Sequence, residues 1–430
     1  MASTKATTSA SCWYAHPSLH IIAFLVFCLL VGFGILARTE RYFGNLYRGW
    51  DSQFYYSAAL SIAYDLDLDI TNDIERTTYP KPFSDQSGGA FTQLPRRSDG
   101  RVLNKYPIGT SLVEVPMVLV GKWFVPESEK NKFPTGFSPT ELRIVAWGLF
   151  IFTSIGLTVL YKNLRKDFGV SGALIGVIGC WSGTSLFYYS AIFPFMSHAI
   201  AFVVLVVCMS IFRGIVASAN VGSSVNMALF TLGLALSALF LVRPQQIVLV
   251  VFLLPQFLYF ASRVEIRRWW IGASLAICSI AMAITVQALI NKDQFQLAGI
   301  NAYSHGGEGF SWLNPDLHAV LISESRGLFR FSPVFLIALM GLMFFARSIP
   351  SYSWAFIANA LFQIYLVAAW SSPLQGDSFG CRMLSDNSAI VAIGLANLYC
   401  HSSAFNRIAI IVLALVCVSW TNYLLLNYIS

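Results

Sequence analysis

Repeated apolar runs of about membrane length are the feature that most constrains this chain. A bilayer core is crossed by about 20 helical residues, and a lipid-exposed segment must satisfy its backbone hydrogen bonds internally. The 430 residues are 56% hydrophobic and only 11% charged, whereas a soluble domain carries roughly 25% charged residues. We therefore predict an all-α fold, a polytopic transmembrane helical bundle. The predicted spans are 19–37, 140–161, 171–190, 195–213, 226–241, 245–261, 270–290, 327–346, 352–370, 386–400 and 408–428.

Two short basic stretches orient this bundle. The loops Lys162–Asp167 and Arg263–Arg268 each carry three Lys or Arg residues, and short basic loops face the cytoplasm. With the N-terminus inside, only an odd number of crossings can separate the first outer loop from Lys162. The stretch 107–124 has the length to span but contains two prolines, a glutamate and a lysine. We predict that it lies along or dips into the outer membrane face, which gives about 11 spans. Twelve spans is the alternative.

The chain divides into a tail and one membrane domain. Residues 1–18 are rich in Ser, Thr and Ala and are expected to form a disordered cytoplasmic tail. No convincing small-residue cleavage site follows 19–37, so an uncleaved anchor is expected rather than a signal peptide. Residues 19–430 form the integral membrane domain. Within it, 38–138 is a long first outer loop region in which we expect interfacial helices.

Charge and cysteine usage argue against several classes of partner. The net charge of +7 is spread over the loops, and no dense basic run indicates a nucleic acid partner. The eight cysteines show neither a disulfide framework nor the spacing of a metal site. We predict no cofactor and assign no metal ligands, while the sequence leaves a divalent metal requirement open.

The ionisable residues indicate where a chemical site lies. Away from their ends, the predicted spans contain no Asp, Glu, Lys, Arg or His. Ion-coupled transporters and proton relays usually need such groups at mid-membrane depth. A site at the outer membrane–water boundary fits this pattern better. The ionisable residues at span ends on that side are His198, Arg243, Arg326, Arg330, Arg382 and Asp386.

Asp51 is the candidate catalytic residue. It lies in the first polar stretch after the first span, in the run W-D-S-Q-F-Y-Y. One interpretation is a helix N-cap, in which Asp51 or Ser52 starts a helix through Gln53–Ala63 and stabilises it by about 1 kcal/mol. The other is a carboxylate held beside aromatic groups that takes a proton from an acceptor hydroxyl. The two interpretations are compatible.

Two further features follow in the first outer loop. Asp65, Asp67 and Asp69 alternate with leucines, but Ile70 stands where a calcium loop needs glycine. We expect a solvated turn there, with a metal or substrate role for one of these residues as the alternative. Lys105, just before the predicted interfacial helix, would lie at headgroup level. It would either snorkel there or provide a cation for a lipid phosphate.

The remaining candidate binding residues lie in the later outer turns. His198 is either a capped, hydrogen-bonded residue or a substrate contact. Arg243 lies outside, against the positive-inside trend, which indicates an anionic partner. Arg326 opens the run R-G-L-F-R-F-S-P. Asp377 and Arg382 lie in W-S-S-P-L-Q-G-D-S-F-G-C-R, where two glycines allow close approach of the backbone.

The order of these motifs resembles the GT-C superfamily of polytopic glycosyltransferases. It is most similar to the bacterial relatives of protein O-mannosyltransferases and to the lipid A aminoarabinose transferase. The resemblance covers roughly residues 20–400 and departs at Ser52 and Gln53, where many relatives have a second acidic residue. The matching features are W-D-S-Q-F-Y-Y, D-L-D-L-D, D-G-R-V-L-N-K-Y-P-I-G-T-S-L, the His-bearing turn, the V-R-P turn, R-G-L-F-R-F-S-P and W-S-S-P-L-Q-G-D-S-F-G-C-R.

This resemblance implies an inverting glycosyltransferase that moves a sugar from a polyprenyl-phosphate donor to an acceptor hydroxyl. It implies that Asp51 is the general base and that transfer occurs on the outer face of a bacterial inner (plasma) membrane. The partners would be the lipid-linked donor, membrane lipids and an acceptor glycan, lipid or protein. Cations near the leaving phosphate would lower the barrier, with Lys105 and Arg243 as first choices and then Arg382 and Arg326.

Two other functions remain open from the sequence. A transporter or lipid flippase would line several spans with polar residues, which the apolar span interiors do not favour. A non-catalytic membrane scaffold would keep its activity after Asp51→Asn, a nearly isosteric change. The sugar, the acceptor and the oligomeric state do not follow from the residues.

Overall fold

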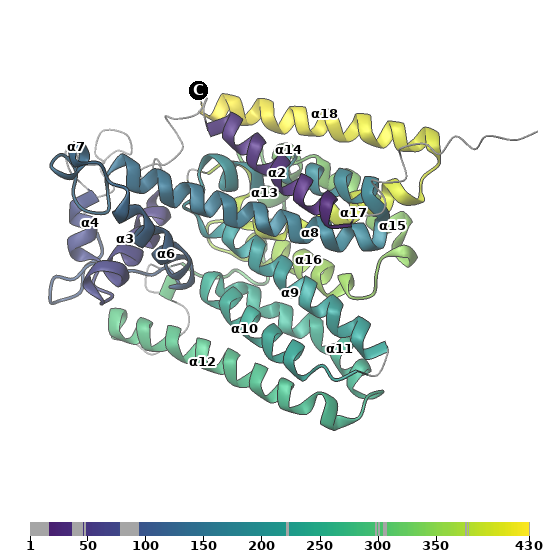
Figure 1. Ribbon diagram of the computed structural model, residues 1–430, viewed down its shortest axis with the longest axis horizontal. Helices are drawn as coiled ribbons and strands as arrows, with labels where there is room; N and C mark the ends of the chain where they lie inside the picture. The colour runs from purple at the N-terminus through teal and green to yellow at the C-terminus, as the bar shows by residue number, and fades with distance from the viewer. Residues whose placement is uncertain are drawn as a thin grey trace, which may run out of the picture.

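The computed structural model describes residues 17–36, 46, 49–77, 94–220, 223–296, 299, 302–303, 308–374, 376 and 378–429. In this part of the chain every extended regular element is a helix, and the only strand-like features are two isolated β-bridges. The all-α class is therefore confirmed (Figure 1). Nearly all of the predicted tail 1–18 lies outside the described residues.

The helices are named by their order along the chain. The longer ones are α2 (Pro17–Leu36), α8 (Pro139–Ser182), α9 (Ser197–Asn220), α10 (Asn226–Val242), α11 (Leu249–Ala261), α12 (Trp270–Phe295), α15 (Val334–Phe344), α16 (Ser353–Ala369), α17 (Ala389–His401) and α18 (Ala404–Ile429). Four described helices fall within the predicted first outer loop region, 38–138, and are called the outer helices after that prediction. They are α3 (Trp50–Leu60), α4 (Thr71–Thr77), α6 (Gly109–Trp123) and α7 (Glu127–Lys130). The short α13 (Leu317–Ile322) and α14 (Leu328–Phe331) come later in the chain. Two short π-helices are η2 (Ser61–Asp65) and η4 (Tyr188–Ile192). Four short 3₁₀-helices are η5 (Pro244–Val248), η6 (Ile266–Arg268), η8 (Ala346–Ser348) and η9 (Arg382–Asn387).

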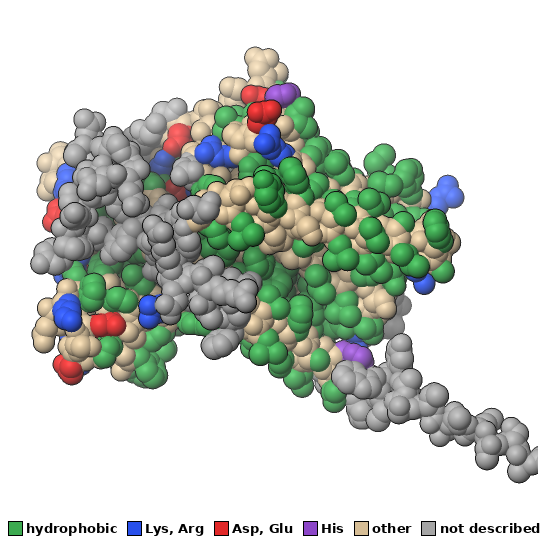
Figure 2. Space-filling view, turned by 90° about the horizontal axis from the view of Figure 1, so that it is seen from above, with side chains coloured by type: hydrophobic (Ala, Val, Ile, Leu, Met, Phe, Trp, Pro, Cys, Tyr) green, Lys and Arg blue, Asp and Glu red, His purple; other side chains and the backbone are tan. Residues whose placement is uncertain are grey.

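Five described helical segments are long and apolar enough to cross a membrane, judged by length and composition. They are Pro139–Ser182, Ser197–Ala219, Pro244–Ala261, Trp270–Phe295 and Ala404–Ile429. Figure 2 shows hydrophobic side chains forming a broad surface over one face of the molecule, with charged side chains gathered toward its edges. Helices α12 and α18 expose large apolar side chains such as Ile277 and Val416. These features are compatible with an integral membrane protein.

Helix α8 covers the predicted span 140–161 and the first part of the predicted span 171–190, and the loop expected between them is absent. Residues 162–167 are helical, so the prediction of a loop there is wrong. The backbone leaves the helical region only at Gly169, with φ 70° and ψ −178°. The rings of Phe150 and Trp181 lie 6.4 Å apart, so the chain doubles back at this glycine. Glycine suits this reversal because it has no Cβ to clash at positive φ.

The stretch 107–124 forms α6, which has 15 residues and contains Pro116. About 20 residues are needed to cross a bilayer core as a helix, so α6 is short for a span. One face of the helix is buried, including Glu114 and Val118, and the opposite face exposes Leu119 and Val120. This two-sided character fits a helix lying on the bundle. Whether it crosses the membrane stays a prediction.

Helices α3, α4, α6 and α7 lie together at one end of the bundle (Figure 1). At the other end, Asp167 of α8 binds Arg213 of α9 with an N–O distance of 2.5 Å and accepts a hydrogen bond from the Tyr352 hydroxyl at 2.5 Å. The Val225 N–H donates to the Arg268 carbonyl at 3.0 Å, which joins the starts of α10 and α12 at this same end. Both basic stretches named in the sequence therefore lie away from α3 and α6.

Candidate functional site

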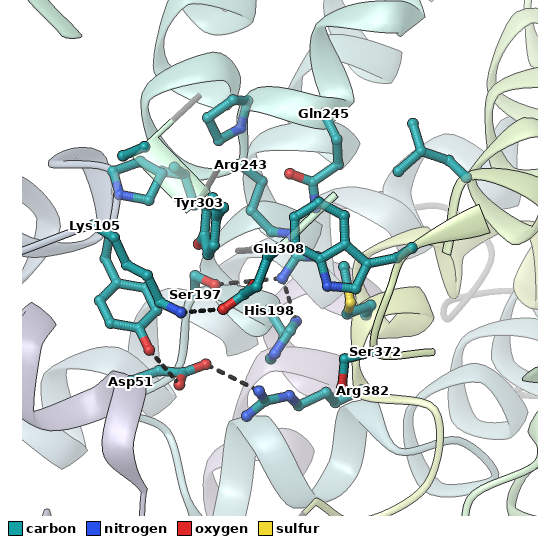
Figure 3. A pocket seen from close by; sticks show the side chains of 18 of the residues that line it. Asp51, Lys105, Ser197, His198, Arg243, Gln245, Tyr303, Glu308, Ser372 and Arg382 are labelled. Carbon is teal, nitrogen blue, oxygen red and sulfur yellow. Dashed lines mark hydrogen bonds and ion pairs between the residues drawn. The ribbon is translucent and has the colours of Figure 1, made fainter. Parts of the chain in front are cut away.

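A cavity of about 570 Å³ lies where the outer helices meet the ends of α9, α10 and α16. Its wall includes Asp51 of α3, Lys105 before α6, His198 of α9, Arg243 after α10, and Arg382 of η9. Figure 3 shows these side chains converging from separate elements on a common space. The structure thus brings five of the seven sequence-predicted site residues to one cavity, although they are spread along most of the chain.

Asp51 is in the first turn of α3, and its two carboxylate oxygens have different partners. Oδ1 accepts a hydrogen bond from the Tyr106 hydroxyl at 2.8 Å. Oδ2 lies 3.1 Å from Nη2 of Arg382. The N-cap position belongs to Gly49, which has no side-chain cap, so the prediction that Asp51 or Ser52 caps the helix is wrong. The Asp51 carboxylate is therefore available to the cavity and is held by two donors.

Burial and charge keep these donors protonated. Burial, and then the nearby Asp51 carboxylate, raise the pKa of Tyr106 well above its ordinary value. The same two causes raise the pKa of Tyr55 to about 12. Burial alone lowers the pKa of Arg382, but the charge of Asp51 and neighbouring tyrosine hydroxyls outweigh it and hold that pKa above the ordinary value. Tyr106 and Arg382 therefore face the Asp51 carboxylate as hydrogen-bond donors.

Arg243 is held by partners on both sides of the cavity wall. Its Nη1 lies 2.7 Å from Nδ1 of His198. Since arginine only donates, His198 accepts at Nδ1 and is a neutral imidazole that carries its proton on Nε2. Behind the wall, Nε of Arg243 lies 3.2 Å from Oδ2 of Asp386. The anionic partner expected for Arg243 is therefore present in this structure as a fully buried aspartate.

Asp386 belongs to a buried polar network between α16, η5 and η9. Its Oδ2 accepts from Gln246 Nε2 at 2.8 Å, and its Oδ1 accepts from Asn387 Nδ2 at 2.8 Å. Asn359, in the middle of α16, donates to Gln246 Oε1 at 2.8 Å and to Asn387 Oδ1 at 3.2 Å. A buried charge needs such partners because it has lost its hydration. The network fixes the orientation in which Arg243 meets the cavity.

Lys105 forms the third cation of the wall. Its ammonium group contacts Oε1 of Glu308, which comes from the loop between α12 and α13. The same Nζ lies 5.3 Å from the centre of the Tyr303 ring and 5.7 Å from that of Tyr106, within the range of a cation–π interaction. Lys105 is thus directed toward the cavity by one carboxylate and two aromatic rings.

Aromatic rings form another part of the cavity wall, which begins beside Lys105 at Tyr303. Tyr303 packs against Trp370 at 5.7 Å, and Trp370 packs edge-on against Phe310 at 4.7 Å. Phe310 in turn stacks on Trp312 at 4.6 Å. A β-bridge between Phe310 and Trp370 joins the two segments that carry these rings. Because aromatic faces pack well on apolar chains and on sugar rings, this wall complements the charged one.

Two predicted site residues do not join this cluster. Arg326 is not among the described residues that line the cavity, and it donates instead to the carbonyls of Ser378 at 3.2 Å and Leu374 at 2.9 Å. It braces the loop before Arg382. Asp377 lies outside the described residues. Over the part of the chain that the structure describes, no group of three or more His, Cys, Asp or Glu side chains is arranged to hold a metal ion.

The turn after α3 has the solvated character expected for it. Leu66 adopts a left-handed conformation with φ 60° and is 87% exposed. Asp67 accepts from the Ser61 hydroxyl at 2.6 Å and from the backbone of Asp69 at 3.0 Å. These carboxylates are thus engaged in closing the turn.

Some site residues were not identified from the sequence. Tyr106 was noted only as part of a chain break, although a tyrosine beside a headgroup-level lysine is a hydrogen-bond donor near the membrane surface. Glu308 lies in a polar loop with no distinguishing motif. Asn359 and Gln246 were overlooked because only ionisable residues were sought within and beside the spans, and amides also form buried networks.

Comparison with models of known protein families finds no match to this chain. Comparison with curated proteins likewise finds no match.

Proposed function

We propose that this chain is a GT-C-like glycosyltransferase of a bacterial inner membrane. In this proposal it moves a sugar from a polyprenyl-phosphate donor to an acceptor hydroxyl on the outer membrane face, with inversion. The proposed topology has about 11 spans, with the cavity facing out. The acceptor would be a glycan, a lipid or a protein.

One observation carries the proposal: two carboxylates, three cations and an apolar aromatic wall share one cavity. A lipid-linked sugar phosphate needs these surfaces together. Its phosphate needs cations, its hydrocarbon needs apolar contacts, and the acceptor hydroxyl needs a base. Lys105 and Arg243 supply the charge, and Phe310, Trp370 and Leu366 supply the apolar surface.

The proposed step is a single displacement. The acceptor oxygen attacks the anomeric carbon while its proton passes to Asp51. The bond from that carbon to the phosphate oxygen breaks, and polyprenyl phosphate leaves with the electron pair. Negative charge grows on the leaving phosphate in the transition state, so fixed cations lower the barrier. Arg382 is paired with Asp51, the proposed base, whereas Lys105 and Arg243 are paired with carboxylates that have no role in the proposed proton transfer. Lys105 and Arg243 are therefore the better candidates for the phosphate.

The test compares purified wild type with Asp51→Asn in lipid bilayers. Both are incubated with a panel of polyprenyl-phosphate sugars and acceptor extracts, and released polyprenyl phosphate is measured. Glu324→Gln is the matched control, since it removes a carboxylate whose side chain is 96% exposed. We expect release by wild type and by the control, and loss of release in a folded Asp51→Asn protein. Equal release by all three proteins would remove Asp51 from the chemistry.

The two other functions make different predictions in the same experiment. A transporter would move a labelled lipid across the bilayer without releasing polyprenyl phosphate. A scaffold would show neither activity and would tolerate Asp51→Asn.

A further inference from the structure

Glu308 is the more exposed of the two carboxylates that line the cavity. It and Lys105 have side chains that are each 28% exposed. The Asp51–Arg382 pair is less exposed, at 19% and 20%. The Arg243–Asp386 pair is nearly inaccessible, at 8% and 0%. The Lys105–Glu308 pair is therefore the most exposed of the three ion pairs.

The backbone beside Glu308 is anchored. The Gly309 N–H donates to the Ser371 hydroxyl at 3.1 Å, and the Gly309 carbonyl accepts from the Ser371 N–H at 2.9 Å. The Ser311 N–H donates to the Ala369 carbonyl at 2.6 Å. With the chain fixed on one side, the Glu308 carboxylate can leave Lys105 by a change of side-chain rotamer. No rearrangement of the aromatic wall is needed.

The charges around the cavity are already matched in pairs. Arg382 faces Asp51, Arg243 faces Asp386, and Lys105 faces Glu308. An anion that bound at Lys105 while Glu308 stayed in place would be repelled by the Glu308 carboxylate. An anion that replaces that carboxylate leaves the total charge unchanged. A phosphodiester carries one negative charge, as Glu308 does.

We infer that Glu308 holds, in the ligand-free protein, the place that the donor's phosphate takes beside Lys105. This inference rests on the proposed function and names the residue that selects the ligand by charge. An anionic lipid offers Lys105 a new partner and displaces Glu308. A neutral long-chain alcohol offers no such partner, so the ion pair stays closed against it. The membrane contains many neutral lipids, and this exchange would prevent them from binding at Lys105.

The test measures binding of farnesyl methyl phosphate, a phosphodiester with one charge, to the full chain in phosphatidylcholine nanodiscs. Trp312 and Trp370 line the cavity, so tryptophan fluorescence reports binding. The proteins are wild type, Glu308→Gln, Lys105→Gln and the double variant. Farnesol serves as the neutral control ligand. Thermal unfolding checks that each variant is folded, and Glu308→Asp, which shortens the side chain, provides a second, milder perturbation.

We expect Glu308→Gln to bind the phosphodiester roughly fivefold more tightly, the size expected when one partly exposed competing ion pair is lost. The phosphodiester affinity of Glu308→Asp should lie between those of wild type and Glu308→Gln. The affinity for farnesol should be the same in all of these proteins. In the Lys105→Gln background the change at Glu308 should have no effect, since the two residues act through one contact. Equal affinity in wild type and Glu308→Gln, weaker binding in that variant, or an effect that persists without Lys105 would overturn the inference.

Failure of the exchange and failure of the proposed function give different results. Sugar transfer by wild type, together with equal phosphodiester affinity in wild type and Glu308→Gln, overturns the exchange alone. A fivefold difference in affinity without transfer from any donor supports the exchange and counts against the glycosyltransferase proposal.

Discussion

Asp51 and Arg382 form an ion pair with an O–N distance of 3.1 Å, although Asp51 belongs to α3 near the start of the chain and Arg382 to η9 near its end. The pair ties α3 to η9 across the cavity. Arg382 was expected to be a cation for the leaving phosphate. In the structure its charge is directed at the Asp51 carboxylate instead. Within the proposed function, Arg382 orients one oxygen of the Asp51 carboxylate while Tyr106 holds the other oxygen.

Arg382→Gln should therefore lower the transfer rate by about 100-fold, comparable to the loss of a fixed donor in other active sites. Arg382→Lys keeps the charge but loses the planar fork, so its rate should lie between those of Arg382→Gln and wild type. Release of polyprenyl phosphate in a single turnover measures both. Arg347→Gln, a change in the distant η8 turn, is the control. A wild-type rate in Arg382→Gln would show that the ion pair does not serve the chemistry.

Tyr106→Phe isolates the second contact of Asp51. The substitution keeps the ring that packs on Tyr55 at 5.1 Å and removes only the hydroxyl. We expect the transfer rate to fall roughly tenfold and the free energy of unfolding to fall by about 1 kcal/mol. Tyr56→Phe is the matched control, because it removes a hydroxyl that donates to the Gly136 carbonyl away from the cavity. If both variants lose the same stability and neither loses activity, the Tyr106 hydroxyl is structural only.

Asp386 should matter for stability far more than an exposed carboxylate. It is fully buried and pairs with Arg243, and removing one partner of a buried ion pair costs about 3–5 kcal/mol. Asp386→Ala should lower the unfolding free energy by roughly that amount, and Asp386→Asn by less, since the amide still bonds to the network. Glu324→Gln should change it by under about 0.5 kcal/mol because that side chain is exposed. Thermal unfolding in detergent checks this ranking, which a fully stable Asp386→Ala protein would contradict.

Much of this site could be anticipated because charged residues at the span ends of one membrane face must lie near a common surface. His198, Arg243 and Arg382 were selected on that ground, and all three line the cavity, whereas Arg326, also at a predicted span end, is not among its lining residues. Asp51 and Lys105 were selected because they lie in the first polar loop region, and both line the cavity. Their pairing could not be anticipated. Which cation meets which carboxylate depends on helix rotation and tilt, which hydropathy does not determine.

The reversal of α8 shows a similar limit on the fold. Apolar length predicted two spans on either side of Lys162–Asp167, and the rings of Phe150 and Trp181 do lie side by side. The basic residues nevertheless continue the helix, because Lys, Arg and Leu are good helix formers. The turn was placed too early since charge was used as the loop signal, whereas Gly169 is the residue that permits the reversal.

Asp73 should make stability depend on pH. Burial, opposed by Arg76 and reinforced by the neighbouring aspartates, raises its pKa from 3.8 to about 7. A raised folded-state pKa contributes stability that is full below pH 3.8 and is lost as the pH rises through 7. Asp73→Asn removes this loss because asparagine does not ionise. The free energy of unfolding of Asp73→Asn relative to wild type should therefore increase between pH 4 and pH 8 by roughly 1–2 kcal/mol after allowance for solvent screening. Thermal unfolding across this pH range measures it, and parallel curves for the two proteins would exclude the effect.

Gly109 sets the distance between the two halves of the cavity. A Cβ at this position would lie 2.4 Å from the Leu241 carbonyl carbon and 2.5 Å from the Val242 nitrogen, which are backbone atoms that cannot rotate away. Gly109→Ala should therefore push α6 from α10, separate Lys105 from Arg243, and lower the unfolding free energy by about 1–3 kcal/mol. Gly214→Ala is the matched control, since its Cβ would meet nothing within 4 Å, and it should be neutral or up to about 1 kcal/mol more stable. Unfolding and transfer assays are run on both variants, and loss of activity in Gly109→Ala without loss of stability would show that the spacing serves the site rather than the fold. An unchanged Gly109→Ala protein would mean that α6 can shift without consequence for either.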